Sequence, residues 1–489
     1  MSASARSMNV LFVHSVSWNY KNKNKPIEEM ESMQLGISYI SSILKSKGHT
    51  THLLVLTDHT KNTDIDLYLK KSNPKLICFT AVYTEYPLIK TTAEYIKNKY
   101  PHIYLIIGGS QPSLEPDLTS EGPFDALCIG EGEYPVLELV EQLEQNKECS
   151  GIQNLWIKKP TGMEKNPSRP FIPDLNELPF PDRDLWKDWA TEQAEEKQVI
   201  LLGRGCPFLC TYCSNHALRK LSDGKYVRFR SPESVIAEMK HVLAHYPKTK
   251  QIYFEVETIG ADMQFSFELC DLLKKFNQEV QNNISYGVNL RIVPAKDYTE
   301  LFTSFKEANF GFINIGLESG SNRVRREILK RHYSNEDIRK TVQTAKDCGI
   351  KINVNVLVGL PGETKEDFNE TIECIKECQP DEARLSIFYP YPGTDLYDMC
   401  KSMGVLQEHL NTAMERRKAV LDLPGFSKKE IQHEYDWFYY NIHKKKAPAL
   451  SLLLKVLHQK FLSSYLLYSL TRGLRNNEYF RRMRSAVSF

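Results

Sequence analysis

Three cysteines within a short segment constrain this chain more than any other feature of its sequence. Cys206, Cys210 and Cys213 have the spacing Cys-x-x-x-Cys-x-x-Cys, lie next to glycines, and follow the apolar run 199–202. Thiolates at this spacing can bind three irons of a cubane cluster and leave the fourth iron open to a small molecule. The alternative is incidental cysteines in a reducing compartment. We favour the cluster, so the segment predicts a [4Fe–4S] site.

Composition sets limits on the rest of the chain. Its 489 residues are 41% hydrophobic and 25% charged, as in ordinary globular proteins of about three domains. The net charge of +2 gives no general attraction to nucleic acid or membrane. The sequence contains no apolar segment long enough to span a membrane and no signal-peptide core at its start. We therefore expect a cytoplasmic protein that does not bind nucleic acid.

Residues 8–148 alternate between apolar strands and amphipathic helices. Such alternation predicts a doubly wound, Rossmann-like parallel sheet. The expected strands are Asn9–His14, Thr51–Leu56, Leu76–Thr80, Ile103–Ile107 and Ala126–Ile129. Glycines directly after two of them, Gly108 with Gly109 and Gly130, let a bulky ligand approach the carboxyl edge of the sheet. An empty flavodoxin-like domain would show similar glycines.

Residues 149–195 break this pattern with prolines and charges, which predicts a surface linker. Strands and helices then resume over residues 196–400. Together with the strand before the cysteines, six repeats predict a partial (β/α)6 TIM barrel whose active site faces the carboxyl ends of its strands. Residues 401–489 predict a helical, basic C-terminal region, with helix from about Met414 onward.

The segment Gly203–Cys213 resembles the cluster loop of radical S-adenosylmethionine enzymes. In that superfamily the open iron chelates the amino and carboxylate groups of S-adenosylmethionine. The resemblance implies reductive cleavage of this cofactor to methionine and a 5′-deoxyadenosyl radical, which removes hydrogen from an unactivated carbon. It also implies an external electron donor such as flavodoxin or ferredoxin.

The first domain resembles the cobalamin-binding domain of one subclass of these enzymes. The similarity rests on the segments Ser32–Tyr39, Gly108–Ser113 and Gly130–Glu133. The Asp-x-His-x-x-Gly motif of better-known cobalamin proteins is absent, and His14 is interpreted as a loop histidine, so a degenerate domain without corrinoid stays an alternative. The cofactor-binding residues that the resemblance implies here are Gly108, Gly109, Gln111, Ser113, Gly130 and Glu131.

The resemblance also assigns residues at the strand ends of the barrel. Glu257, in preference to Glu255, is expected to accept from the methionyl ammonium, and Asn289 and Arg291 to hold the cofactor carboxylate or the substrate. Glu318 and Ser319 match a ribose- and carboxylate-binding segment. Gly359 matches an adenine-binding segment, Tyr212 belongs to the cluster loop, and the segment 389–394 is expected to line the substrate side. The alternative for each residue alone is a helix cap or a turn.

Two further features have ordinary interpretations. Cys374 and Cys378 are four residues apart and are expected to pack on a helix face. Residues 441–489 contain ten Lys or Arg and one acidic residue, Glu478, beside leucine-rich segments such as Leu452–Leu454 and Tyr465–Tyr468. This pattern suggests either a membrane-surface helix or a helical cap on the barrel, and the first interpretation would allow a lipid-like substrate.

By this resemblance we expect a cobalamin-dependent radical methyltransferase that acts on a small-molecule or lipid-like substrate. Cyclisation, rearrangement or carbon–carbon coupling by the same domains is a second hypothesis, and a non-catalytic cofactor-binding protein is a third. A tRNA methylthiolase is disfavoured, because such enzymes carry additional cluster cysteines in the N-terminal domain and a small RNA-binding barrel at the C-terminus. Here Cys78, Cys128 and Cys149 lie in expected strands or the linker, and the tail is expected to be helical.

Overall fold

The structure is a computed structural model that describes residues 7–16, 24–280, 283–407, 410–412 and 414–464. The chain divides into two compact units. The first comprises residues 1–207 and 214–253, and the second comprises residues 208–213 and 254–489.

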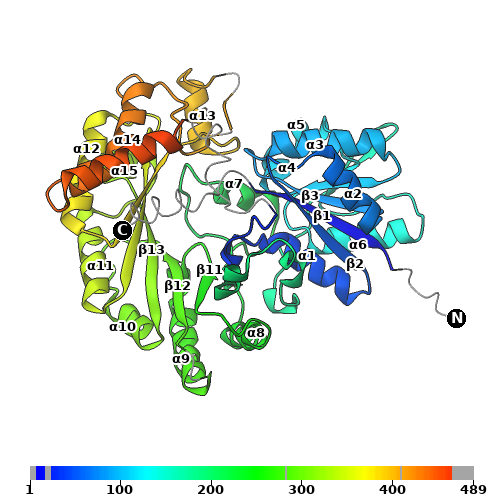
Figure 1. The fold of residues 1–489 in the computed structure, drawn as a ribbon, viewed down its shortest axis with the longest axis horizontal. Helices are drawn as coiled ribbons and strands as arrows, with labels where there is room; N and C mark the ends of the chain where they lie inside the picture. Colours follow the sequence, from blue (N-terminus) through cyan, green and yellow to red (C-terminus); the bar gives the residue numbers. More distant parts are fainter. Residues whose placement is uncertain (1–6, 17–23, 281–282, 408–409, 413, 465–489) are drawn as a thin grey trace. The chain divides into compact units, whose positions relative to one another are not determined.

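The first unit contains a seven-stranded sheet in the order β2-β1-β3-β4-β5-β6-β7. β1, β2 and β3 of this sheet are labelled in Figure 1. Neighbouring strands among β1 to β5 pair in parallel, and the order 2-1-3-4-5 is typical of doubly wound sheets. The predicted Rossmann-like sheet is therefore confirmed. Its strands are β1 (Asn9–Ser15), β2 (Thr50–Leu56), β3 (Leu76–Thr80), β4 (Tyr104–Gly108), β5 (Ala126–Cys128), β6 (Leu155–Lys159) and β7 (Gly162–Lys165).

Two separate hydrophobic cores cover the two faces of this sheet. Phe12 belongs to one core and its neighbour Leu11 to the other, because successive strand side chains point to opposite faces. Helices α1 and α6 contribute to the core of Phe12, and α2 and α3 to the core of Leu11. The helices of this unit are α1 (Leu35–Ser46), α2 (Asn62–Ser72), α3 (Tyr86–Lys99), α4 (Ser110–Leu114), α5 (Pro116–Ser120), α6 (Glu133–Glu144), α7 (Asn215–Leu218) and α8 (Pro232–His245).

Residues 149–195 are not a surface linker, contrary to the prediction. β6 and β7 form a hairpin that pairs antiparallel with β5 and extends the first sheet. Farther along, Trp186 is fully buried, and its indole N–H donates to Ser38 Oγ at 2.8 Å. The prolines interrupt regular helix, but Leu185 and Trp186 after them pack into the same core as Phe12. Ile172, Leu175 and Leu178, which lie between the prolines, pack in a separate cluster with Tyr39 and Ile43 of α1.

The second sheet has six strands in the order β15-β14-β13-β12-β11-β8. β12 to β15 pair in parallel with their neighbours. The six predicted strands are present and, within the described residues, they form an open sheet in which β8 and β15 are the end strands, as in a partial barrel. The strands are β8 (Lys197–Leu201), β11 (Gln251–Glu255), β12 (Ser285–Leu290), β13 (Phe310–Glu318), β14 (Lys351–Val358) and β15 (Glu382–Ile387).

Helices alternate with the strands of this second sheet (Figure 1). They are α9 (Met263–Val280), α10 (Thr299–Glu307), α11 (Asn335–Asp347) and α12 (Lys365–Cys378). α11 and α12 each begin with a capping box, Ser334 with Asp337 and Thr364 with Asp367, which satisfies amides at the helix start.

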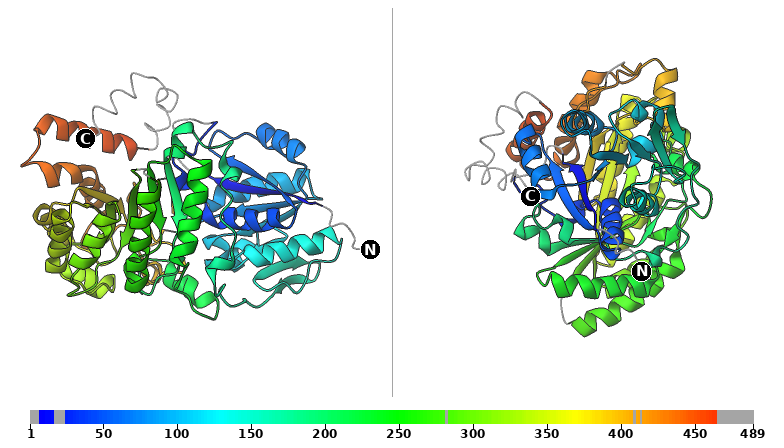
Figure 2. Two further views of the ribbon diagram at one scale, coloured as in Figure 1. Left: turned by 90° about the horizontal axis from the view of Figure 1, so that it is seen from below. Right: turned by 90° about the vertical axis from the view of Figure 1, so that its right-hand side faces the viewer.

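The C-terminal region is helical in part. α13 (Asp395–Ser402), α14 (Lys428–His443) and α15 (Ala449–Leu462) are present, and α15 packs on α14 (Figure 2). The predicted helix from Met414 begins only at Lys428, since residues 414–427 form turns and an isolated bridge. Tyr465–Tyr468 lie outside the described residues. In the part of the chain that the structure describes, no helix has the length and apolar character needed to cross a membrane.

Candidate active site

The cysteine loop leaves the first unit from a short antiparallel pair. β9 (Gly203–Arg204) pairs with β10 (Arg228–Phe229). Gly205 follows with φ 86°, and a Cβ there would lie 2.3 Å from the Tyr226 carbonyl oxygen. A side chain would require both a left-handed conformation and a displaced backbone, so the turn into Cys206 requires glycine.

The three cysteines of this loop form no disulfide. Cys210 is buried, while Cys206 and Cys213 are partly exposed. Reduced thiols at this spacing are a suitable donor set for three irons. Among the described residues no three His, Cys, Asp or Glu side chains are already gathered as metal ligands, so closure of the three sulfurs around a cluster belongs to our proposal.

Tyr212, directly before the third cysteine, lies in a polar cluster of the second unit. Its hydroxyl donates to Glu318 Oε1 at 2.8 Å and accepts from Arg331 Nη2 at 2.7 Å. Arg331 also lies 3.2 Å from Glu318 Oε1 and donates to the Gly316 carbonyl at 2.6 Å. Burial raises the pKa of Tyr212 well above its ordinary value, so the phenol stays protonated. The Glu318 oxygen expected to accept from ribose is therefore already used by two side chains of the chain itself.

Arg291 lies against the middle cysteine. Its Nη1 is 2.5 Å from Cys210 Sγ, and its guanidinium stands 3.8 Å from the centre of the Phe208 ring. This contact places a positively charged donor beside the sulfur of Cys210. The backbone amide of Arg291 donates to Thr258 Oγ1 at 2.9 Å, which fixes the end of β12. The sequence indicated that Arg291 belongs to the site, but not this contact with sulfur.

The side chains of Glu257 and Asn289 have different surroundings. Glu257 follows β11 and is exposed, as a carboxylate that awaits an ammonium group would be, whereas Glu255 lies inside the strand and is half-buried. Asn289 donates through Nδ2 to the Val256 carbonyl at 3.1 Å, so part of its side chain holds the loop after β11.

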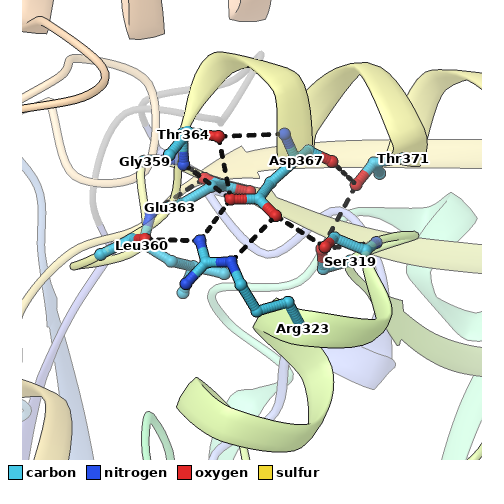
Figure 3. A network of polar contacts seen from close by, with 10 residues as sticks. Ser319, Arg323, Gly359, Leu360, Glu363, Thr364, Asp367 and Thr371 are labelled. Atoms are coloured by element: carbon cyan, nitrogen blue, oxygen red, sulfur yellow. Dashed lines mark hydrogen bonds and ion pairs between the residues drawn. The ribbon is translucent and has the colours of Figure 1, made fainter.

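Ser319 is fully buried, in the network shown in Figure 3. Its hydroxyl lies 3.3 Å from Thr371 Oγ1 and accepts from the Ser321 amide at 3.2 Å. These contacts place the Ser319 hydroxyl in the support of the loop after β13, away from the surface where a cofactor would be met.

Gly359 has φ 81°, and its amide donates to the buried carboxyl of Glu363 at 2.7 Å (Figure 3). The Leu360 amide donates to the same oxygen at 3.1 Å. Burial raises the pKa of Glu363 to about 8. The glycine turn predicted after β14 is present, and a carboxyl group that sequence reasoning did not select holds it from inside.

The carboxyl edge of the first sheet is built from close backbone contacts. Gly109 has φ 100°, and a Cβ there would lie 2.6 Å from the Ala81 carbonyl oxygen. Ser113 Oγ donates to the Gly109 carbonyl at 2.8 Å and accepts from the Gly130 amide at 3.0 Å. Gly108 ends β4 just before this turn. Four predicted residues, Gly108, Gly109, Ser113 and Gly130, therefore lie together at one edge.

Several buried polar atoms of the first unit have no hydrogen-bond partner in the described part of the chain, and three of them follow strands of the first sheet or end one. These three are His14 Nδ1, Ser15 Oγ and Gln111 Oε1. His14 and Ser15 end β1, and Gln111 lies in α4 directly after β4. His14 is thus a strand residue, not the predicted loop histidine, and burial lowers its pKa to about 4, so its imidazole is neutral. Polar atoms without partners beside glycine turns fit a polar ligand such as cobalamin at this edge.

Glu131 does not point to a free ligand site, although it was predicted to bind the cofactor. Its carboxylate accepts from Arg204 Nη1 at 2.9 Å and from Arg228 Nη2 at 2.9 Å. The Ile172 amide adds a third donor at 2.8 Å. Arg204 also donates through Nη2 to Glu133 at 2.5 Å. Glu131 therefore holds the β9–β10 pair from which the cysteine loop extends. Arg204 and Arg228 are distant in sequence from the segment Gly130–Glu133, so that segment alone could not indicate these ion pairs.

Known proteins match both halves of this arrangement. Residues 200–375 match the Radical SAM superfamily, and residues 29–140 match the B12 binding domain. A protein of Pyrococcus horikoshii named "Uncharacterized methyltransferase PH0819" is 30% identical over 377 residues, which are 76% of this chain and 79% of the relative. The chain belongs to the radical SAM superfamily. It is a radical SAM enzyme homologous to cobalamin-dependent methyltransferases.

Two further relatives are similar to this radical SAM enzyme. The anaerobic magnesium-protoporphyrin IX monomethyl ester cyclase of Rubrivivax gelatinosus is 24% identical, over 80% of this chain and 69% of the relative. The structure of the cobalamin-dependent S-adenosylmethionine radical enzyme OxsB has the same fold, with a TM-score of 0.67 at 15% identity, over 98% of this chain and 75% of that one. The predicted cofactors, a [4Fe–4S] cluster, S-adenosylmethionine and cobalamin, are confirmed at the level of the family.

Proposed function

We propose that this radical SAM enzyme methylates an unactivated carbon of a small-molecule or lipid-like substrate. The observation that carries the proposal is the combination, in one chain, of the cysteine loop with a B12 binding domain whose carboxyl edge holds polar atoms without partners. When bound, the cluster and S-adenosylmethionine supply a 5′-deoxyadenosyl radical, and cobalamin supplies a methyl carrier.

The chain's own residues bind and orient these groups. The three cysteines bind iron, and the exposed Glu257 accepts from the methionyl ammonium. Arg291 holds the methionyl carboxylate beside Cys210, with Asn289 fixing the neighbouring loop. The backbone of the turn at Gly359 is proposed to run beside the adenine. Positioning of this kind is the main contribution of a protein whose cofactors carry the difficult chemistry.

At the first sheet, Gly108, Gly109, Gln111, Ser113 and Gly130 are proposed to line the corrinoid. We propose domain boundaries close to the predicted ones, at residues 8–148, 196–400 and 401–489, with residues 149–195 completing the first domain. An external one-electron donor such as flavodoxin or ferredoxin would reduce the cluster. A cytoplasmic location fits such a donor.

The test is anaerobic reconstitution with iron, sulfide and hydroxocobalamin, followed by incubation with S-adenosylmethionine that carries a deuterated methyl group. We expect 5′-deoxyadenosine, methionine and transfer of the labelled methyl group to substrate from a cell extract. Cys206→Ala should abolish 5′-deoxyadenosine, whereas Cys348→Ala, a partly exposed cysteine outside the loop, should not. Formation of 5′-deoxyadenosine with an unlabelled product would refute methyl transfer.

Radical cyclisation without methyl transfer is the second candidate function. The cyclase of Rubrivivax gelatinosus, which resembles most of this chain, favours it. The same experiment separates the two, because a cyclised product loses hydrogen and gains no labelled carbon.

We also propose that α15 contacts an anionic membrane surface. Leu450, Leu453, Leu454 and Leu457 follow helical spacing and are exposed, with Leu450 72% and Leu457 63% accessible. The exposed lysines 444–446 directly precede this helix. An apolar face beside cations is the pattern of helices that lie on anionic bilayers.

Sedimentation with vesicles of phosphatidylglycerol and phosphatidylcholine tests this contact. We expect binding that weakens with salt and is lost in Leu453→Gln/Leu457→Gln. The matched control is Leu67→Gln, which alters an equally exposed leucine of α2. Failure of the wild type to sediment with anionic vesicles would overturn the proposal.

A further inference from the structure

The stem of the cysteine loop is held by ion pairs to the loop that follows β5. Arg204, two residues before Cys206, uses one guanidinium nitrogen for Glu131 at 2.9 Å and the other for Glu133 at 2.5 Å. Glu131 also pairs with Arg228, which lies opposite Arg204 in the β9–β10 ladder. All four side chains lie in the first unit, and Glu133 and Arg228 are 3% exposed.

This arrangement fixes the guanidinium of Arg204 in both position and orientation. A planar fork that donates to two different carboxylates has one orientation that satisfies both. The backbone after it has little room to adjust, because Gly205 has φ 86° and a Cβ there would lie 2.3 Å from the Tyr226 carbonyl oxygen. A displaced Glu131 carboxylate would therefore disturb Arg204, which lies two residues before Cys206.

Glu131 is connected to the glycine turns at the carboxyl edge of the first sheet through the residue before it, Gly130. Its neighbour Gly130 donates its amide to Ser113 Oγ at 3.0 Å, and Ser113 Oγ donates to the Gly109 carbonyl at 2.8 Å. The contacts run without a gap from Gly109 through Ser113, Gly130 and Glu131 to Arg204. A ligand at this edge would lie at the Gly109 end of this series of contacts. Cys206 lies two residues after Arg204, which is the other end.

We propose that the Glu131–Arg204 ion pair couples cobalamin binding at the first sheet to the geometry of the cluster loop. Glu131, Glu133 and Arg204 act as positioning residues, since they act through Cys206 and the glycine turns. The inference rests on cobalamin binding in the proposed function and adds to it an energetic link between the two cofactor sites. Such a link is reciprocal, so the cluster must change cobalamin affinity as much as cobalamin changes cluster affinity.

Titration of the full chain with hydroxocobalamin, followed by absorbance, measures the link. The dissociation constant is compared between wild-type protein with a reconstituted cluster and the same protein after chelation of iron. We expect the two constants to differ by about fivefold or more, the lower end of the usual range for coupled sites. In Glu131→Gln the ratio should fall to near one, while iron content and cobalamin binding persist.

Electron paramagnetic resonance of the reduced cluster gives an independent readout. Hydroxocobalamin should shift the cluster signal in the wild type and leave it unchanged in Glu131→Gln. The matched control is Glu138→Gln, which breaks a single ion pair to Arg169 at 2.9 Å in the same unit and should behave as wild type. A merely structural role of Glu131 would lower stability in the variant but keep the ratio and the signal shift.

If Glu131→Gln does not fold, Arg204→Lys tests the coupling between cobalamin binding and the cluster loop. Lysine keeps the positive charge but lacks the fork that reaches both carboxylates, so the ratio should fall below the wild-type value. An undiminished ratio in the folded variant, or a ratio of one in the wild type, would overturn the inference alone. If wild-type protein bound no hydroxocobalamin, the proposed methyl transfer and this inference would both fail.

Discussion

The buried carboxyl of Glu363 makes stability depend on pH in a way that Glu363→Gln should remove. Burial raises its pKa from 4.5 to about 8. Between these values the folded chain keeps a proton that the unfolded chain has released, so the folded chain binds more protons and its stability falls as pH rises. From pH 5 to pH 7 this loss amounts to about 2.5 kcal/mol, at about 1.4 kcal/mol per pH unit.

Glutamine resembles the protonated side chain, because its carbonyl oxygen can accept from the Gly359 and Leu360 amides as Glu363 does. We expect Glu363→Gln to match the wild type near pH 5 and to exceed its stability by about 2 kcal/mol or more at pH 7. Chemical unfolding at both pH values measures the difference, and the other titrating groups cancel in the comparison.

The control is Glu366→Gln, which alters an exposed carboxylate in the first turn of α12 and should leave the pH dependence unchanged. Equal dependence of stability on pH in the wild type and Glu363→Gln would refute the assignment of a neutral, buried Glu363. A variant that is less stable at pH 7 would show that the ionised carboxylate is the form that holds the turn.

Three further substitutions test other parts of the structure. Gly205→Ala should lower cluster content severalfold, measured as iron per chain, because its Cβ would lie 2.3 Å from a carbonyl oxygen; Gly151→Ala, with φ 68° but open space, should retain iron. Glu238→Ala should cost about 3–5 kcal/mol in thermal unfolding, since it leaves two buried arginines unpaired, and a loss below 1 kcal/mol would contradict that pairing. Arg331→Met should slow 5′-deoxyadenosine formation at unchanged iron content, because Tyr212 loses its cationic partner; an unchanged rate would separate this cluster of side chains from the chemistry.

Hydrophobic patterning was sufficient to predict the second sheet and the five parallel strands of the first, but not the β6–β7 hairpin. Each predicted strand of the first domain coincides with an observed strand to within one or two residues, and the six predicted repeats of the barrel correspond to six observed strands. Short apolar runs between helices leave a parallel strand as the only compact arrangement, so periodicity determines the fold class.

Side-chain pairing could not be predicted in the same way. Glu131 was expected to meet a ligand, but its partners Arg204 and Arg228 lie over 70 residues away and are recognised only in space. Arg331 lies in a polar loop without hydrophobic periodicity, and the residues next to it in the sequence do not indicate that it contacts Tyr212. The prolines around Trp186 suggested exposure because proline excludes helix, whereas burial there depends on a core formed by distant strands.

The β6–β7 hairpin also affects how copies of this chain behave toward one another. It ends the first sheet with β7, a four-residue strand in which Glu164 and Lys165 supply charge and Lys165 reaches Asp117 at 2.8 Å. Short, charged end strands are poor templates for pairing with another sheet. Self-association through this sheet would therefore have to use its other end, β2, which makes Thr50–Leu56 the place to examine if the protein aggregates during anaerobic preparation.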